Sequence, residues 1–231
     1  MSFGQNLQFL RKMHEGMTQE KLAEKIGVSR QTISKWEIDV AFPEMEAAIA
    51  LCKLFSCSLD ELLRGNMNSD NDAYTNIRVE KVPTFQYIKY AVISGAPEND
   101  AIEHIKTWTA TCGIEKPKII GWDFPFVSQE QINVYHMHGY TAACVLPPDF
   151  ETSCANIEII TRASQQYAII TIREPFSAPF SLIPNAYKTL MRYIEVNGFP
   201  RKQTKDILPC FEREYKKDSI SYMDVYIAVE P

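Results

Sequence analysis

One predicted helix, over residues 30–37, has several side chains of the types that form hydrogen bonds with nucleotide bases. Its polar side chains are Arg30, Gln31, Thr32, Ser34 and Lys35. Arginine and lysine donate hydrogen bonds to guanine, and glutamine forms paired bonds with adenine. Ile33 and Trp36 are spaced to turn the opposite side of the helix toward a core. The segment therefore predicts a helix that is anchored by its apolar side and reads the major groove with its polar side.

A second short helix, over residues 18–26, has the features needed to position the first one. Thr18 and Ser29 are placed to cap the helices that follow them. Gly27 stands where the chain must turn sharply, because glycine reaches positive φ without a steric cost. Ala23, four residues earlier, is small enough for two helices to cross closely. This spacing is typical of a helix-turn-helix.

The run of residues 18–37 resembles the Cro/cI-type (XRE) family of bacterial DNA-binding domains, and the resemblance extends over about residues 3–64. It implies a five-helix, lambda-repressor-like head. Gln19, at the start of the first motif helix, is expected to bond a phosphate beside the helix dipole. The implied DNA contacts are Gln19, Arg30, Gln31, Thr32, Ser34 and Lys35. The alternative is an ordinary helical hairpin, whose outer face would carry mainly Glu and Lys.

The charge is unevenly distributed along the first part of the chain. The net charge of the 231 residues is −5, which by itself argues against a nucleic-acid-binding protein. From Arg11 to Trp36, however, six Lys or Arg stand against three Glu, whereas from Glu37 to Glu61 six acidic residues stand against one lysine. Such an asymmetry steers one face toward phosphate. Residues 67–231 carry 16 basic and 20 acidic groups, so no second nucleic-acid surface is expected.

Cysteine usage and hydropathy indicate a broad class. The six cysteines include no C-x-x-C pair and most have apolar neighbours, as is typical of reduced, buried thiols. No apolar run approaches the roughly 18 residues of a membrane span, and the N-terminus lacks a secretory pattern. We therefore expect a cytoplasmic protein with no membrane partner and no cofactor. His136 and His138 suggest a metal, but without a third ligand they are weak evidence, so no metal site is predicted.

The segmentation predicts two domains, residues 1–64 and 77–231, joined by a polar linker over residues 65–76. The five helices of the first domain are expected over residues 3–14, 18–26, 30–37 and 43–55 and from Ser58 onward. Pro43 suits the first turn of the fourth helix. Ser58 and Glu61 form a capping box that opens the fifth.

The second domain is predicted to be α+β. Short β-branched and aromatic runs favour strands over residues 77–82, 87–94, 118–124, 132–138, 141–146, 157–161, 167–173 and 222–229. Two helices, over residues 100–112 and 184–197, match each other at a shift of 85 positions. We interpret this as two copies of a strand-helix-strand-strand (SHS2-type) module, the alternative being chance similarity of two amphipathic helices.

The last predicted strand has two different faces. One face carries the aliphatic row Met223, Val225, Ile227 and Val229, which suits packing against helices. The other face carries Tyr222, Asp224 and Tyr226. With both helices on one face of the sheet, we expect the opposite face to be concave near the join between the two modules.

Five pieces of the second domain, in order, look like the gyrase-inhibitor-like (GyrI-like) effector-binding domain, over about residues 74–231. The pieces are residues 121–123, 140–144, 183–190, 208–215 and 223–227. The resemblance implies a ligand-binding cleft in which aromatic side chains and one acidic residue meet cationic, lipophilic compounds. Glu212 matches the acidic residue, and Trp122 and Tyr226 match cleft aromatics. Tyr140 and Tyr187 complete the expected ligand-binding set.

Glu212 is also a candidate on physical grounds. A carboxylate beside the apolar residues 209–211 would lose hydration if it pointed inward, and a buried anion needs a partner. A delocalised cation between aromatic rings supplies charge pairing and cation–π attraction of about 0.5–2 kcal/mol. Two alternatives stay open. Glu212 pairs with Arg213 or Arg173 at the surface, or Glu214 is the inward carboxylate, because an error of one residue in strand phase reverses the inward side chains.

Two function classes follow from these patterns. The preferred one is a ligand-responsive one-component bacterial transcription regulator. It would act as a homodimer on a roughly palindromic double-stranded operator, with recognition helices about 34 Å apart, and take a small hydrophobic or cationic effector in its second domain. The competing class is an enzyme, a hydrolase of electrophilic xenobiotics or natural products with Glu212 as general base. In a third interpretation the second domain is a ligand-free dimerisation scaffold.

Overall fold

The computed structural model describes residues 2–14, 16–65, 73–148, 150 and 157–230. The chain divides into two compact units. The first unit contains residues 1–74, 178–201 and 230–231, and the second contains residues 75–177 and 202–229. The predicted first domain thus lies within the first unit, which also includes a helix from the later part of the chain. Residues 66–72 of the expected linker lie outside the described residues.

Five helices open the first unit, as the sequence predicts. They are α1 (Phe3–Met13), α2 (Gln19–Ile26), α3 (Arg30–Glu37), α4 (Met45–Leu54) and α5 (Leu59–Arg64). The side chains of Thr18 and Ser29 accept hydrogen bonds from the first-turn backbones of α2 and α3. Gly27 ends α2 at a φ of 81°, the left-handed conformation that the sharp turn requires. These local signals fix the angle between α2 and α3.

The expected role of Pro43 is wrong, whereas that of Ser58 is confirmed. Glu44 is the N-cap of α4, with the extended φ and ψ of −64° and 159°, so Pro43 precedes the helix and stands outside its first turn. Ser58 and Glu61 form the predicted capping box at the start of α5. A proline can stand before an N-cap as readily as after it, since it needs no donor at either place.

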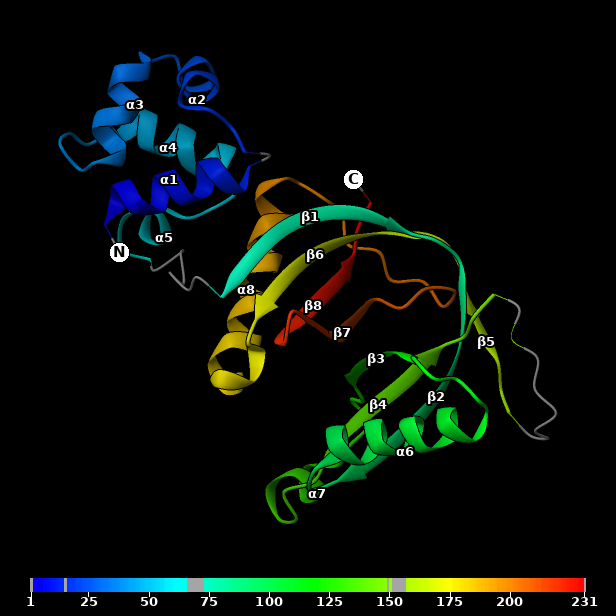
Figure 1. The fold of residues 1–231 in the computed structure, drawn as a ribbon. Helices are drawn as coiled ribbons and strands as arrows, with labels where there is room; N and C mark the ends of the chain where they lie inside the picture. Colours follow the sequence, from blue (N-terminus) through cyan, green and yellow to red (C-terminus); the bar gives the residue numbers. More distant parts are fainter. Residues whose placement is uncertain (1, 15, 66–72, 149, 151–156, 231) are drawn as a thin grey trace. The chain divides into compact units, whose positions relative to one another are not determined.

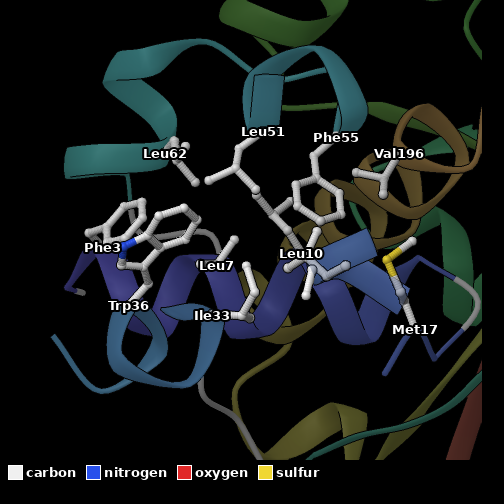
Figure 2. Close-up of a cluster of buried hydrophobic side chains, with 12 residues drawn as sticks. Phe3, Leu7, Leu10, Met17, Ile33, Trp36, Leu51, Phe55, Leu62 and Val196 are labelled. Carbon is white, nitrogen blue, oxygen red and sulfur yellow. The ribbon is translucent and has the colours of Figure 1, made fainter. Parts of the chain in front are cut away.

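One apolar core joins the five helices, and Figure 2 shows labelled side chains of α1, α3, α4 and α5 converging in it. Its fully buried members include Leu7, Leu10, Leu22, Ile33, Leu51, Phe55 and Leu62. Trp36 is 4% exposed and packs in the same cluster. Because burial of one such side chain contributes about 1.5–3 kcal/mol, this core holds α3 firmly from behind.

The first unit also contains α8 (Pro179–Val196). Val196, at the C-terminal end of α8, is 3% exposed within the core of the head, and Figure 2 shows it beside Phe55. The next residue, Asn197, donates a hydrogen bond from its Nδ2 to the carbonyl of Met13, at 3.0 Å. The sequence pattern assigns this helix to the second domain alone, whereas its C-terminal turn belongs to the packing of the head.

Eight strands in the described part of the chain form one sheet. They are β1 (Tyr74–Val82), β2 (Phe85–Ser94), β3 (Lys118–Asp123), β4 (His138–Val145), β5 (Ile160–Arg162), β6 (Gln165–Arg173), β7 (Cys210–Lys217) and β8 (Ile220–Ala228). Their order in the sheet is β1-β6-β8-β7-β3-β4-β2-β5. The helix α6 (Pro97–Thr111) packs against β2 and β4, as Figure 1 shows.

The predicted duplication is confirmed by the order of the elements. Along the chain, β2-α6-β3-β4 is followed by β6-α8-β7-β8. In the sheet, the strands of the first module lie in the order β3-β4-β2 and those of the second in the corresponding order β7-β8-β6. The two modules meet where β3 pairs with β7, and there Gly121 lies opposite Glu212.

Two strand predictions are wrong. Residues 132–138 do not form a strand, because Ser128 and Gln131 form a capping box that starts a short helix, α7 (Gln129–Asn133), and β4 begins only at His138. The expected strands also omit β7, in which five of the eight residues are charged, so that it lacks the apolar pattern of a core strand. In both cases the local sequence pattern does not reveal which elements of the sheet the segment packs against.

Candidate functional site

The polar side of α3 is exposed, and its apolar side is buried. Arg30, Gln31 and Lys35 are exposed, and Thr32 and Ser34 are partly exposed. Ile33 is 0% exposed and lies on the opposite side of the helix. The hydroxyl of Thr32 also lies 2.9 Å from that of the N-cap residue Ser29, which holds the first turn in place. A helix fixed in this way presents a rigid row of donors and acceptors, which is what reading base edges requires.

A buried ion pair holds Gln19 at the start of α2. Arg11 Nε donates to Glu37 Oε1 at 2.5 Å and Arg11 Nη2 to Glu37 Oε2 at 3.0 Å, and both side chains are nearly inaccessible. Gln19 Nε2 donates to Glu37 Oε2 at 2.8 Å. An amide nitrogen carries two hydrogens, so this bond orients the Gln19 side chain and leaves its second N–H for an acceptor such as a phosphate oxygen.

The Arg11–Glu37 pair corrects the charge argument made from the sequence. Arg11 counts among the basic residues of the first half of the head, yet it is buried and neutralised by Glu37. Sequence reasoning missed both residues, and the available signal is their position: each follows directly on a core residue, Leu10 or Trp36. The exposed cations counted in this part of the head are therefore Lys12, Lys21, Lys25, Arg30 and Lys35.

Arg30 is also paired in this structure. Its Nε lies 2.9 Å from Glu20 Oε1 of α2, and both side chains are mostly exposed. A surface pair of this kind contributes little, typically about 0–1 kcal/mol, so the guanidinium can exchange Glu20 for a base or a phosphate at small cost.

Next to α3, a strip of apolar side chains is exposed, which the sequence analysis did not single out. We call these residues the apolar strip: Ile38, Val40, Phe42 and Met45, each between 64% and 68% exposed. They follow directly on the C-terminus of α3 and continue into α4. Clustered apolar side chains on a surface mark interfaces more often than single ones do.

The second unit contains a cavity of about 460 Å³ at the join between the two modules. Its lining comes from α6, β3, β4, β7, β8 and the segment before α8: Ile102, Lys106, Pro117, Ile119, Ile120, Gly121, Tyr140, Phe176, Glu212, Glu214, Tyr215, Lys216, Ser221 and Tyr222. A volume of this size suits a drug-sized molecule. We call it the join cavity.

Gly121 shapes the join cavity by having no side chain. A Cβ at this position would lie 2.0 Å from the hydroxyl oxygen of Tyr140 on the neighbouring strand β4. The Tyr140 ring therefore lies across Gly121, where the chain pairs with Glu212 of β7. The glycine brings a phenol and a carboxylate from two modules to one wall of the cavity.

Charges of both signs line the join cavity, because Lys106 and Lys216 stand beside Glu212 and Glu214, and the carboxylates act on one another. Burial raises the pKa of Tyr140, and the nearby Glu212 carboxylate raises it further. Burial, followed by the charge of Glu98, also raises the pKa of Glu214. The pKa of Glu98 is raised by burial and by Asp123. The carboxylates therefore destabilise one another's charge, and a cation placed among them would relieve this repulsion.

The structure brings two of the five predicted ligand residues together, Tyr140 and Glu212. Glu214 joins them, because residues two apart on a strand share a face, so the choice between Glu212 and Glu214 disappears. Arg213, the proposed surface partner of Glu212, lies on the other face, 5.4 Å from the Tyr215 ring centroid. Tyr187 lies on α8 in the first unit, so it is not placed relative to this cavity.

Trp122 and Tyr226 lie on the opposite face of the sheet. The Trp122 ring packs edge-on against Tyr87, at 6.0 Å between centroids, and Tyr226 stacks on Phe211 at 4.3 Å. Both belong to one aromatic core cluster. The expected concave face opposite the helices is therefore wrong for Glu212: residues of α6 line the join cavity, which puts the cavity on the helix-bearing face. Strand alternation separates neighbours such as Gly121 and Trp122.

A buried acid on the aromatic face was missed. Asp224 is 4% exposed and accepts a hydrogen bond from Thr171 Oγ1 at 2.6 Å. Arg78 Nη2 lies 3.5 Å from its other oxygen. The signal in the sequence was one acidic residue between tyrosines on an otherwise apolar last strand. These partners neutralise Asp224 within the fold, so the carboxylates of the join cavity remain the better candidates for a ligand.

Two expected absences concern metals and membranes. Within the described ranges, no three metal-binding side chains come together, and His138 starts β4 while His136 precedes it in a left-handed conformation. No helix among the described residues is both long enough and apolar enough to cross a bilayer.

Comparison of the sequence with protein families gives one match, to the helix-turn-helix model, over residues 7–62. The HTH-type transcriptional activator BcrR of Enterococcus faecalis is 48% identical over 65 residues, which are 28% of this chain and 31% of BcrR. The uncharacterized HTH-type transcriptional regulator YgzD of Bacillus subtilis (strain 168) is 38% identical over 47 residues, 20% of this chain and 71% of YgzD. This chain thus spans about a third of BcrR.

Several solved structures are similar to parts of the chain. The P22 c2 repressor in complex with a synthetic operator is 35% identical, covers 29% of this chain and 98% of its own, and has a TM-score of 0.27. The EcmrR–DNA complex in EcmrR-RPo is 14% identical, covers 96% of this chain and 80% of its own, and has a TM-score of 0.48. SAV2435 bound to tetraphenylphosphonium is 15% identical, and the match covers 68% of this chain and 94% of SAV2435, with a TM-score of 0.40.

Proposed function

This chain belongs to the helix-turn-helix family of transcription regulators, and from that premise we propose that it is a one-component bacterial regulator. It binds operator DNA through α3 and a small effector in the join cavity. The observation that carries the first half is the exposed polar face of α3, held from behind by Ile33 and Trp36. The observation that carries the second half is the join cavity, about 460 Å³ in volume, in which apolar side chains surround two carboxylates, with Lys106 and Lys216 also in the lining.

The DNA contacts of the proposal are the exposed side chains of α3 together with Gln19. Arg30, Gln31, Ser34 and Lys35 read base edges, while Thr32 and Gln19 contact the backbone beside the N-termini of α3 and α2. The bond from Gln19 to Glu37 supports this role, because a phosphate contact gains from a side chain that is already oriented.

The test of the DNA half begins with an operator selected by the wild-type chain from a random pool of duplexes. Fluorescence anisotropy at fixed salt then compares the wild type with Arg30→Ala/Lys35→Ala. Each good base contact contributes about 1–3 kcal/mol, so the double variant should lose at least about 30-fold in affinity and most of its preference over a scrambled duplex. Lys53→Ala, an exposed lysine on α4, is the control for lost charge. Unchanged specific binding by the double variant would overturn the assignment.

The proposed regulator acts as a homodimer on a roughly palindromic operator. The apolar strip supports a contact between two heads, since it adjoins α3 and would fix the spacing of two recognition helices. Phe42→Ser should weaken the dimer on DNA, so that sedimentation of the complex shows one chain bound where the wild type shows two. A variant that sediments like the wild type would move the dimer contact elsewhere.

The proposed effector is a lipophilic cation. Glu212 and Glu214 supply the negative charge, and the Tyr140 ring supplies a face for cation–π attraction, worth about 0.5–2 kcal/mol. A delocalised cation fits better than an ammonium ion, because it loses little hydration on entering an apolar cavity.

Calorimetric titration of the full chain with tetraphenylphosphonium tests this half. Glu212→Gln should weaken binding about ten-fold or more, because it removes a charge without changing the volume. Glu103→Gln removes an exposed charge of α6 that does not line the cavity, and should bind like the wild type. Equal affinity for the Glu212 variant would remove this residue from the site. Absence of saturable binding in the wild type would leave the second unit as a dimerisation scaffold.

A further inference from the structure

We infer that α8 transmits effector occupancy to the DNA-reading head, an inference that rests on the proposed function. The chain connects α8 to the join cavity at both of its ends. Phe176, three residues before α8 begins, lines the cavity, and the first strand after α8 is β7, which carries Glu212 and Glu214. The helix itself is packed in the first unit. A bound molecule that displaces Phe176 would therefore shift the N-terminal end of α8 through the chain. The C-terminal end of the same helix is packed in the head.

The C-terminal part of α8 is fastened to the other helices of the head by an ion pair, by polar contacts and by apolar packing. Arg192 forms an ion pair with Glu61 of α5, and its Nη1 lies 3.5 Å from the carbonyl of Ser56. Asn197 Nδ2 donates to the carbonyl of Met13 at 3.0 Å. Val196 is buried in the core of the head, and its carbonyl lies 2.9 Å from His14 Nδ1. These contacts reach both α1 and α5, so the turn is held in a defined place.

The docking point lies two residues from the network that orients the DNA contacts. Met13 is the last residue of α1, and Arg11 in the same turn holds Glu37, which in turn holds Gln19. Arg11 Nη1 also donates to the carbonyl of Met17, at 2.6 Å, just before α2. A shift at the end of α1 would therefore change the position of Gln19 and the approach of α2 to a phosphate.

Pro184 gives α8 a place to bend. A proline inside a helix lacks the N–H that would bond to the preceding turn, so the helix yields there more easily than elsewhere. The residues before Pro184 connect to Phe176, and the residues after it lead to Arg192 and Val196. The helix thus has a soft first part, joined through the chain to Phe176, and a fastened last turn.

Such a coupling changes DNA affinity only if the contacts of α8 differ between the free and the occupied protein. Measured couplings between two sites typically amount to about 5- to 150-fold in affinity, and they are reciprocal. Tetraphenylphosphonium should therefore change the affinity for the selected operator by at least about five-fold, and the operator should change the affinity for tetraphenylphosphonium by the same factor.

The experiment uses the full chain, the selected operator and tetraphenylphosphonium as the probe. Operator affinity is measured with and without saturating probe for the wild type and for Arg192→Gln/Asn197→Asp. Asn197→Asp is isosteric and replaces the donor to the Met13 carbonyl by an acceptor, and Arg192→Gln removes the ion pair with Glu61. Both changes leave Val196 and the core intact. Lys188→Ala, at an exposed position of α8 away from these contacts, is the matched control.

The expected result is that the double variant binds the probe and the operator each within about two-fold of the wild type, while the coupling factor falls to about one. Full coupling in the control and its loss in the double variant support the inference. A double variant that couples as strongly as the wild type overturns the inference and leaves the proposed function standing. A wild type that binds both ligands without coupling overturns the inference together with the effector response in the proposed function.

Discussion

The two units of this protein carry their functional side chains in opposite ways. In the head, all the candidate DNA contacts except Gln19 lie on α3, within residues 30–35, and a helix period of 3.6 turns them away from the buried side. In the second unit, the wall of the join cavity combines α6, β3, β4 and β7, with residues as far apart as Ile102 and Glu212. A site built from one helix is visible in a linear pattern. A site built from strand pairing depends on register and on which face each residue takes.

The largest effect expected concerns the buried pair in the head. Glu37→Ala leaves the Arg11 guanidinium buried without its partner, and losing one member of a buried pair costs about 3–5 kcal/mol. Urea denaturation followed by circular dichroism should show this loss of stability in the head. Glu46→Ala removes an exposed acid of α4 and should change the free energy of unfolding by less than about 0.5 kcal/mol. If the two variants had equal free energies of unfolding, the Arg11–Glu37 pair would not contribute to the stability of the head.

The second effect concerns the glycine that shapes the join cavity. Gly121→Ala places a methyl group against the Tyr140 hydroxyl, so the ring must leave its position. We expect tetraphenylphosphonium affinity to fall at least ten-fold, because the ring and the β3–β7 pairing both change. Gly95→Ala is the control, since a Cβ there meets nothing within 4 Å. Wild-type affinity in Gly121→Ala, measured by calorimetry, would show that the cavity does not depend on this close approach.

The third effect is a pH dependence of the same cavity. Burial raises the pKa of Glu214 and of Glu98 above the ordinary value of 4.5, so these groups take up protons at a higher pH than exposed carboxylates do. Cation affinity should therefore be greatest above these raised pKa values and fall as the pH is lowered through them. Glu214→Gln should reduce this dependence on pH, measured in titrations with tetraphenylphosphonium at a series of pH values from neutral downward. A pH dependence equal to that of the wild type would exclude Glu214 as its source.

The smallest effect concerns the exposed pair beside α3. Glu20→Gln releases Arg30 and removes a negative charge near the DNA, so operator affinity should rise about two- to three-fold with a stability change below about 0.5 kcal/mol. Glu24→Gln removes a charge from the same helix without touching Arg30, and the difference between the two variants isolates the pair. Identical anisotropy curves for both variants would mean that only net charge matters.

Prediction from the sequence succeeded where local signals decide the structure. Caps at Thr18, Ser29 and Ser58 and the left-handed turn at Gly27 give the helices of the head almost residue by residue. The duplicated modules were also predictable, because their helices match at a fixed shift. The boundaries of the two domains and the roles of individual site residues remain predictions.

Prediction failed where a residue's role depends on partners far away in the chain. In the sequence, Arg11 counts as a DNA-facing cation, yet in the structure its side chain is nearly inaccessible and is paired with Glu37. Trp122 and Tyr226 have the composition of a ligand site, but the pleat turns them to the face opposite Glu212. The same pleat puts Glu212 and Glu214 side by side, which a count of acids near aromatics does not reveal.

The amino-acid sequence alone determined the helix-turn-helix, the outward row of polar side chains on α3 and the presence of two similar modules, because caps, turns and periodicity act over a few residues. Only the tertiary structure decided where the join cavity lies and which tyrosines line it, and that the last turn of α8 packs into the head. Strand register and helix docking are set by contacts between residues far apart in the chain, such as Gly121 with Glu212 and Met13 with Asn197. No local pattern encodes such contacts.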